Sequence, residues 1–230
     1  MDRRKLLGTM GTTAAGLAAG VSMRPDAVAA EPHDETPVGQ FHLSLCAFHI
    51  AKRDPKFQVE AQHYCSPVND EVHQCVIFDS NRKDARILGV EYIISDRLYR
   101  GLPVAEKKYY HPHTYEVLSG LLIAPDLAEA AETELMGKLV TTWGKTWHTW
   151  ADPKAALPMG EPLLMWAHTK DGQIDPELLA ARDRRFGVAT PAMRQRRAHL
   201  GPVPQVNPPK SVDEIGRQWT NEGPDEPGRK

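Results

Sequence analysis

Cysteine and histidine are the residues here best suited to chemistry, because sulfur and imidazole nitrogen are ligands that zinc and other late first-row metal ions prefer. The chain contains three cysteines and ten histidines. Several of them stand close together, and a nearby glutamate could complete a ligand set. The candidate metal ligands are His49, His63, Cys65, His111, His113 and Glu116.

The spacing of these residues determines which of them can share a face. On a helix, His42, Cys46 and His49 would lie on one side because they are spaced i, i+4 and i+7. On strands, the pairs at 63–65 and 111–113 would each point to one side. None of these spacings is an established zinc signature. The alternative is that the cysteines are small buried residues and the histidines ordinary hydrogen-bonding residues.

The segment His111-x-His113-x-x-Glu116 resembles the first metal motif of cupin barrels. Cupins place the glutamate one or two residues further on, and in a regular strand Glu116 would face away from both histidines. A β-bulge would be needed to bring the three side chains together. Pro112 also indicates the edge or the start of a strand, where exposed histidines need no ligand role.

Cysteine pairing is a competing use of the same sulfur atoms. Residues 58–66 and 72–79 alternate as two strands around a turn, which places Cys65 and Cys75 nearly opposite each other. Directly opposed strand residues have the separation that a disulfide tolerates. An oxidising compartment would favour a Cys65–Cys75 disulfide with Cys46 as the free thiol, but a shift of one residue in register would separate the two sulfurs.

The motifs of the common catalytic frames are missing from this sequence. It has no G-x-S-x-G elbow, phosphate-binding glycine loop, H-E-x-x-H helix or C-x-x-C pair. Glu60, Glu91 and Glu116 fall in predicted strands, where they could form a carboxylate pair, face solvent or pair with histidines. This absence, taken together with the family resemblance set out below, leads us to expect a non-enzymatic binding or structural protein with an unidentified small ligand or a lipid. The alternative is a metal-dependent enzyme that uses the His/Cys/Glu cluster with zinc or another transition metal.

Apolar patterning predicts the strands that must position these residues. The hairpin at 58–79 is followed by a strongly apolar third strand over 86–95 and a fourth strand over 113–123. Two further strands are expected at 146–151 and 163–169. Because most strands follow one another through tight turns, the pattern favours antiparallel pairing.

The predicted helices begin with residues 41–52 and include a long amphipathic helix over 126–145. Asp175 reads as the N-cap of a later helix that extends to about Phe186, and a short basic helix follows. The expected fold is α+β: a single domain with a mainly antiparallel sheet packed by one long helix and shorter C-terminal helices.

Six segments resemble the oil body-associated proteins of plant seeds and their fungal and bacterial relatives. They are LCAFH at 45–49, VEAQHYC at 59–65, QCVIFD at 74–79, GVEYIIS at 89–95, HPHTYEV at 111–117 and WGKTW at 143–147. They occur in unbroken order over more than half of the chain. The resemblance implies a soluble single domain of uncharacterised function, lipid-droplet association in the plant members and no established catalytic activity. An export signal sets this chain apart, as a bacterial exported member.

The N-terminus has the features of an export signal. Residues 1–30 combine Arg3-Arg4, a short Gly/Ala-rich apolar stretch and small residues before a cleavage point, as in twin-arginine signals. We expect a linker at 31–40, the domain at 41–200 and a proline-rich, disordered tail at 201–230. The expected location is periplasmic or secreted, with no transmembrane segment once the signal is removed.

Composition argues against one class of partner. The formal net charge is −2 at pH 7, with 25% charged residues. Such a chain has no global attraction to nucleic acid, so nucleic-acid binding is disfavoured.

Overall fold

A computed structural model describes residues 36–201. The predicted leader at 1–30 and the predicted tail beyond Gly201 lie outside the described residues. Seven strands form one sheet: β1 (Leu43–Ala51), β2 (Asp54–Asn69), β3 (Val72–Phe78), β4 (Ile87–Ile94), β5 (His111–Pro112), β6 (Trp143–His148) and β7 (Leu163–Trp166).

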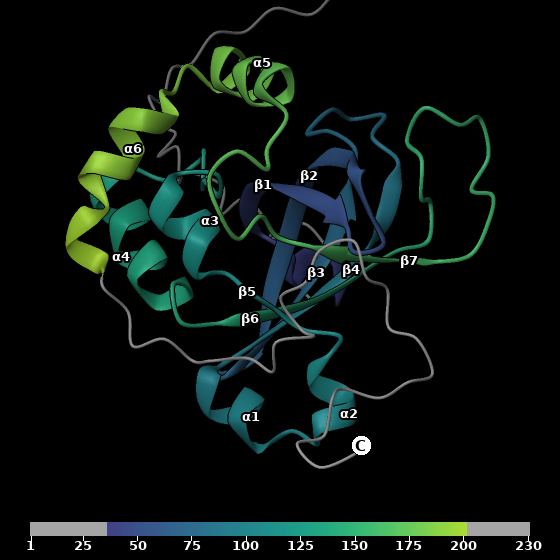
Figure 1. The fold of residues 1–230 in the computed structure, drawn as a ribbon, viewed down its shortest axis with the longest axis horizontal. Helices are drawn as coiled ribbons and strands as arrows, with labels where there is room; N and C mark the ends of the chain where they lie inside the picture. The colour runs from purple at the N-terminus through teal and green to yellow at the C-terminus, as the bar shows by residue number, and fades with distance from the viewer. Residues whose placement is uncertain (1–35, 202–230) are drawn as a thin grey trace, which may run out of the picture.

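Short helices connect and cover these strands. They are α1 (Asp96–Gly101), α2 (Val104–Lys107), α3 (Thr114–Ser119), α4 (Glu129–Leu139), α5 (Pro176–Phe186) and α6 (Thr190–Arg196), with 3-10 turns at Val38–Gln40 and Ala198–Leu200. In Figure 1, α3, α4 and α6 gather on one side of the strands, and α1 and α2 lie at another end.

The sheet closes on itself as an antiparallel barrel of six strands. The strand order is β4-β3-β2-β1-β7-β6-β5, and β4 also pairs with β6, which joins the two ends of the sheet. β5 pairs only with the first two residues of β6, Trp143 and Gly144, and stays outside the closed ring. The predicted sheet packed by one long helix is therefore wrong, because edge-to-edge pairing of β4 and β6 replaces the helix as the cover of the sheet's inner face.

The predicted helix over residues 41–52 is a strand, β1. Every residue from Leu45 to Ala51 is buried. One face of the strand looks into the barrel and the other is covered, so its apolar residues do not alternate with polar ones. A doubly buried strand cannot be told from a buried helix by periodicity alone.

Two further elements differ from the prediction. The expected strand over 113–123 is largely helix α3, which ends at Gly120 with a φ of 83°, a conformation that glycine adopts without strain. The expected long helix over 126–145 stops at Leu139, and Trp143 already belongs to β6. Pairing of β6 with β4 and stacking of Trp143 on Tyr99, with ring centroids 3.5 Å apart, override the local helical pattern.

Local signals predicted the β2–β3 hairpin and helix α5 correctly. In the hairpin, Cys65 lies opposite Cys75, in the predicted register. At α5, the Asp175 carboxylate accepts a hydrogen bond of 2.8 Å from the backbone N–H of Glu177, and Pro176 begins the helix. Both elements rest on contacts between residues close in sequence.

Candidate metal centre

Polar side chains converge inside the barrel because their strands are in register. Across an antiparallel pair, partners directly opposite each other point to the same face. Leu45 of β1 lies opposite His63 of β2, so His49, four residues after Leu45, also faces inward. Cys75 of β3 lies opposite both Cys65 and Glu91 of β4, which brings Glu91 to the same interior. The barrel thus encloses imidazoles and a carboxylate together.

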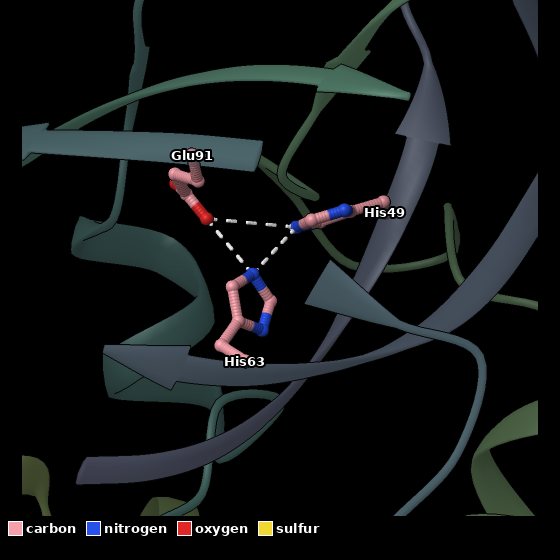
Figure 2. A group of neighbouring side chains, drawn as sticks. All are labelled: His49, His63 and Glu91. Atoms are coloured by element: carbon pink, nitrogen blue, oxygen red, sulfur yellow. Dashed lines mark hydrogen bonds and ion pairs between the residues drawn. The ribbon is translucent and has the colours of Figure 1, made fainter. Parts of the chain in front are cut away.

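His49, His63 and Glu91 form a compact triangle (Figure 2). The Nε2 atom of His63 lies 2.8 Å from Oε2 of Glu91 and 3.2 Å from Nε2 of His49. The third side, from Nε2 of His49 to Oε2 of Glu91, measures 3.9 Å. All three side chains are almost fully buried, with exposures of 2–3%.

Two more histidines reach the other oxygen of Glu91. Nε2 of His113 lies 3.2 Å from Oε1, and Nε2 of His111 lies 3.5 Å from it. His111 comes from β5 and His113 is the N-cap residue of α3, so both enter from outside the six-stranded ring. The two rings are themselves in edge contact, with centroids 5.2 Å apart.

Gly144 of β6 makes room for this second pair. A Cβ atom at this position would clash with Oε1 of Glu91 and lie only 2.5 Å from Nε2 of His113 and 2.7 Å from Nε2 of His111. β5 pairs with β6 at this point, His111 opposite Gly144. The three polar groups therefore occupy the space that a side chain at position 144 would fill.

The histidines are held by their Nδ1 atoms. Nδ1 of His63 lies 3.2 Å from the carbonyl oxygen of Ala61, and Nδ1 of His113 lies 2.8 Å from Oγ1 of Thr142. The Thr142 hydroxyl donates its own hydrogen to the Leu139 carbonyl, so it accepts from His113. Nδ1 therefore carries a proton in both rings, so in the neutral imidazole the Nε2 lone pair points at Glu91.

His148 of β6 supports His49 in the same way. Its Nε2 atom lies 2.9 Å from Nδ1 of His49. If His49 donates from Nδ1, its Nε2 lone pair also faces Glu91. Such outer partners fix the tautomer and orientation of metal-binding histidines.

Burial and mutual contact shift the ionisation of these groups. Burial lowers the pKa of His49 well below its ordinary value and that of His111 to about 4. Burial opposes ionisation of Glu91, but its close contacts with the rings of His111, His113 and His63 outweigh burial and hold the pKa of Glu91 well below its usual range. The centre therefore presents one carboxylate surrounded by imidazoles, a donor set suited to zinc and related ions.

Glu116 and a small cavity border the centre. Oε1 of Glu116 lies 3.9 Å from Nε2 of His113, and burial raises the pKa of this carboxyl to about 7. His113 and Glu116 lie one turn apart at the start of α3, so no β-bulge is involved. A cavity of about 10 Å³, enough for about one water molecule, touches His49, His63, Glu91, His113 and Glu116.

The structure separates the cysteines from this centre. Cys65 and Cys75 form a disulfide across β2 and β3, with Cα atoms 4.0 Å apart, so Cys65 presents no thiolate to a metal. Cys46 is a buried free thiol whose Sγ lies 3.4 Å from Oε1 of Glu60. Of the candidate ligands, the four histidines meet, Glu116 is adjacent and Cys65 is engaged elsewhere.

Sequence reasoning gave Glu91 no ligand role and overlooked His148. Glu91 could have been found from its position in β4, where alternate residues, Gly89 and Glu91 among them, face the barrel interior. His148 could have been found by the same count along β6, where it lies opposite Gly89. That register depends on β4 pairing with β6, which no local pattern indicates.

Comparison with known proteins places this chain beside one group of relatives. Residues 35–201 match the family model described as "Protein of unknown function (DUF1264)". Oil body-associated protein 1B of Arabidopsis thaliana is 40% identical over 185 residues, which cover 80% of this chain and 77% of that protein. Oil body-associated proteins 1A and 2A of Zea mays are 40% and 37% identical, over 75% of this chain and 73% and 69% of theirs.

No solved structure matches the chain. Among residues 36–201, no helix has the length and apolar character needed to cross a bilayer. The matched region coincides with the described domain, and the resemblance seen in the six sequence segments is confirmed. The chain belongs to the oil body-associated protein family, and its residues 35–201 match the DUF1264 model.

Proposed function

We propose that this protein binds a divalent transition-metal ion inside its barrel, with zinc as the first candidate. The observation that carries the proposal is the contact between Nε2 of His63 and Oε2 of Glu91 at 2.8 Å. Because Nδ1 of His63 faces a carbonyl oxygen, this contact sets a nitrogen lone pair against a carboxylate. Such a contact is repulsive unless a cation or an additional proton lies between the two atoms.

Metal binding explains this cluster better than a structural role does. Buried polar groups are costly unless they are fully hydrogen-bonded, and a well-packed apolar core would be at least as stable. Nδ1 atoms of His111 and His148 have no hydrogen-bond partner among the described residues. The hydrogen-bond network of the cluster is therefore incomplete, whereas His63 and His113, each held at Nδ1 with Nε2 turned toward Glu91, have the arrangement that a metal centre requires of its ligands.

Metal analysis of the full chain tests the proposal. We expect the purified protein to retain zinc or a related ion after gel filtration, and Glu91→Gln to lose most of it, because the amide keeps the shape but removes the charge. Glu71→Gln is the matched control, since Glu71 forms an ion pair with Arg97 away from the centre. Metal-free wild-type protein that also fails to bind added zinc would refute the proposal.

Association with a lipid surface is a second candidate function. Its support is a groove of about 420 Å³ with mainly apolar walls that include Phe41, Val76, Phe78 and Ile87, and with Lys83 among its lining residues. Ile87 is 53% exposed and Val38, which also lines the groove, is 80% exposed, so exposed apolar side chains gather at this groove. The matched relatives are named for association with oil bodies.

Co-sedimentation with lipid-coated droplets tests this second candidate. Ile87→Lys should weaken sedimentation with the droplets, because it puts a charge into the apolar groove. Val104→Lys, at an exposed apolar position in α2, makes the same change in charge outside the groove. Equal sedimentation of both variants and the wild type would remove the groove from consideration.

We also propose that residues 1–30 direct export through the twin-arginine route to the periplasm or the exterior. The Cys65–Cys75 disulfide supports this proposal, because disulfides persist mainly in oxidising compartments. Replacing Arg3 and Arg4 by lysine should retain the protein in the cytoplasm of an expressing bacterium. Unchanged fractionation of that variant would contradict export by this route.

A further inference from the structure

We propose that the centre holds two divalent transition-metal ions, bridged by the carboxylate of Glu91. This inference rests on the proposed metal binding and adds a second ion to it. One ion is bound by His49, His63 and Oε2 of Glu91, and the other by His111, His113 and Oε1 of Glu91.

Each carboxylate oxygen of Glu91 has its own pair of imidazoles. Oε2 faces Nε2 of His63 at 2.8 Å and Nε2 of His49 at 3.9 Å. Oε1 faces Nε2 of His113 at 3.2 Å and Nε2 of His111 at 3.5 Å. Among the described residues, His49, His63 and Glu91 form one set of ligand atoms within 4.8 Å of one another, and Glu91, His111 and His113 form another. Glu91 is the member that the two sets share.

Each set has the dimensions of a coordination site. Two ligands of one zinc ion are at most about 4.2 Å apart, twice a bond of about 2.1 Å. The three distances within the His49/His63/Glu91 set, 3.2, 2.8 and 3.9 Å, are all shorter than this limit. In the other set, the distances of 3.2 and 3.5 Å from Oε1 of Glu91 to Nε2 of His113 and His111 are shorter as well. A μ-carboxylate that binds one ion through each oxygen is a common bridge in two-metal sites, where the ions stand about 3.5–4 Å apart.

The two sets are also positioned independently. His49 and His63 belong to β1 and β2 in the barrel wall, with Nδ1 contacts to His148 and the Ala61 carbonyl. His111 and His113 belong to β5 and the start of α3, and Thr142 orients His113. Each half of the centre thus has its own outer support, as two separate metal positions would need.

Additional ligands are present for two ions. Glu116 brings a second carboxylate to within 3.9 Å of Nε2 of His113. The cavity of about 10 Å³ beside both sets takes about one water-sized ligand, which fits a water or hydroxide shared by the ions. Larger molecules have no room there, so water is the ligand class that this cavity admits.

Manganese loading of the full chain measures the number of ions. The protein is stripped with a chelator, loaded with excess Mn²⁺ and desalted, and its bound metal is measured by elemental analysis and electron paramagnetic resonance. We expect two ions per chain and an exchange-coupled spectrum in place of the isolated-ion signal. One ion per chain with an isolated-ion signal would overturn the bridged pair and leave the proposed metal binding intact. If no ion of any kind binds, the proposed function itself fails.

Half-site variants provide a second readout on the same chain. The double variant His111→Gln/His113→Gln should retain one ion per chain and show only the isolated-ion signal. His199→Gln, at an exposed histidine, is the control and should keep both ions. Loss of all metal from a double variant whose circular dichroism matches the wild type would contradict two separable positions. If that variant does not fold, the wild-type spectrum alone decides the question.

Discussion

Replacing Gly144 by alanine should damage the centre without removing any of its polar groups. The added Cβ would clash with Oε1 of Glu91 and lie 2.5 Å from Nε2 of His113 and 2.7 Å from Nε2 of His111. Contacts below 3.0 Å force the neighbours to move, and here all three neighbours are almost fully buried side chains. Glycine at this position is required by space, since its φ is not among the positive values.

The size of the effect follows from overpacking. Forcing a methyl group into a filled interior costs about 1–3 kcal/mol. For a domain of this size, each kcal/mol lowers Tm by about 2–4 °C, so we expect a decrease of roughly 2–12 °C. Displaced histidines should also bind metal about 10–100-fold more weakly, as when outer supports of a metal ligand are lost.

Differential scanning calorimetry and metal titration measure the two effects. Gly101→Ala is the control, because a Cβ there would meet no described atom within 4 Å and Gly101 ends helix α1. That variant should be unchanged or slightly more stable. Wild-type Tm and wild-type metal affinity in Gly144→Ala would refute the idea that the missing side chain creates the space for the cluster.

Three further predictions concern the centre and the cysteines. Removing metal with a chelator should lower Tm by roughly 5–11 °C relative to protein held at 100 times the metal Kd, because such saturation adds about 2.7 kcal/mol of stability; identical melting curves would contradict this. Thr142→Val should weaken metal binding about 10–100-fold, because it removes the hydroxyl that accepts from Nδ1 of His113. The neighbouring variant Thr141→Val should bind metal like the wild type, and a calorimetric titration measures both affinities. Cys46 should react with a thiol reagent only after denaturation, because burial raises the pKa of its thiol, and a reactive thiol in the native protein would disagree.

The sequence predicted those parts of the fold that local contacts decide. The β2–β3 hairpin follows from alternation on both sides of a turn, and the opposition of Cys65 and Cys75 follows from counting along it. Helix α5 follows from Asp175 and Pro176 at its start. In both elements, residues a few positions apart satisfy one another, so the pattern and the structure agree.

The sequence was misleading where both sides of an element are buried or where distant pairing takes over. β1 reads as a helix because the residues from Leu45 to Ala51 are buried on both faces. The end of the predicted long helix became β6 because Trp143 and its successors pair with β4. In each case, contacts with residues tens of positions away outweighed local preference.

The candidate site also has a part that the sequence indicated and a part that only the tertiary structure revealed. Residue types alone placed His49, His63, His111 and His113 among the candidate ligands, since imidazole nitrogen is a ligand that late first-row metal ions prefer. Their common partner, Glu91, became apparent only when the closure of β4 on β6 turned the inner faces of distant strands toward one point. The sequence determines which side chains are able to bind a metal, and barrel closure decides which of them meet, because register across strands is fixed by tertiary pairing.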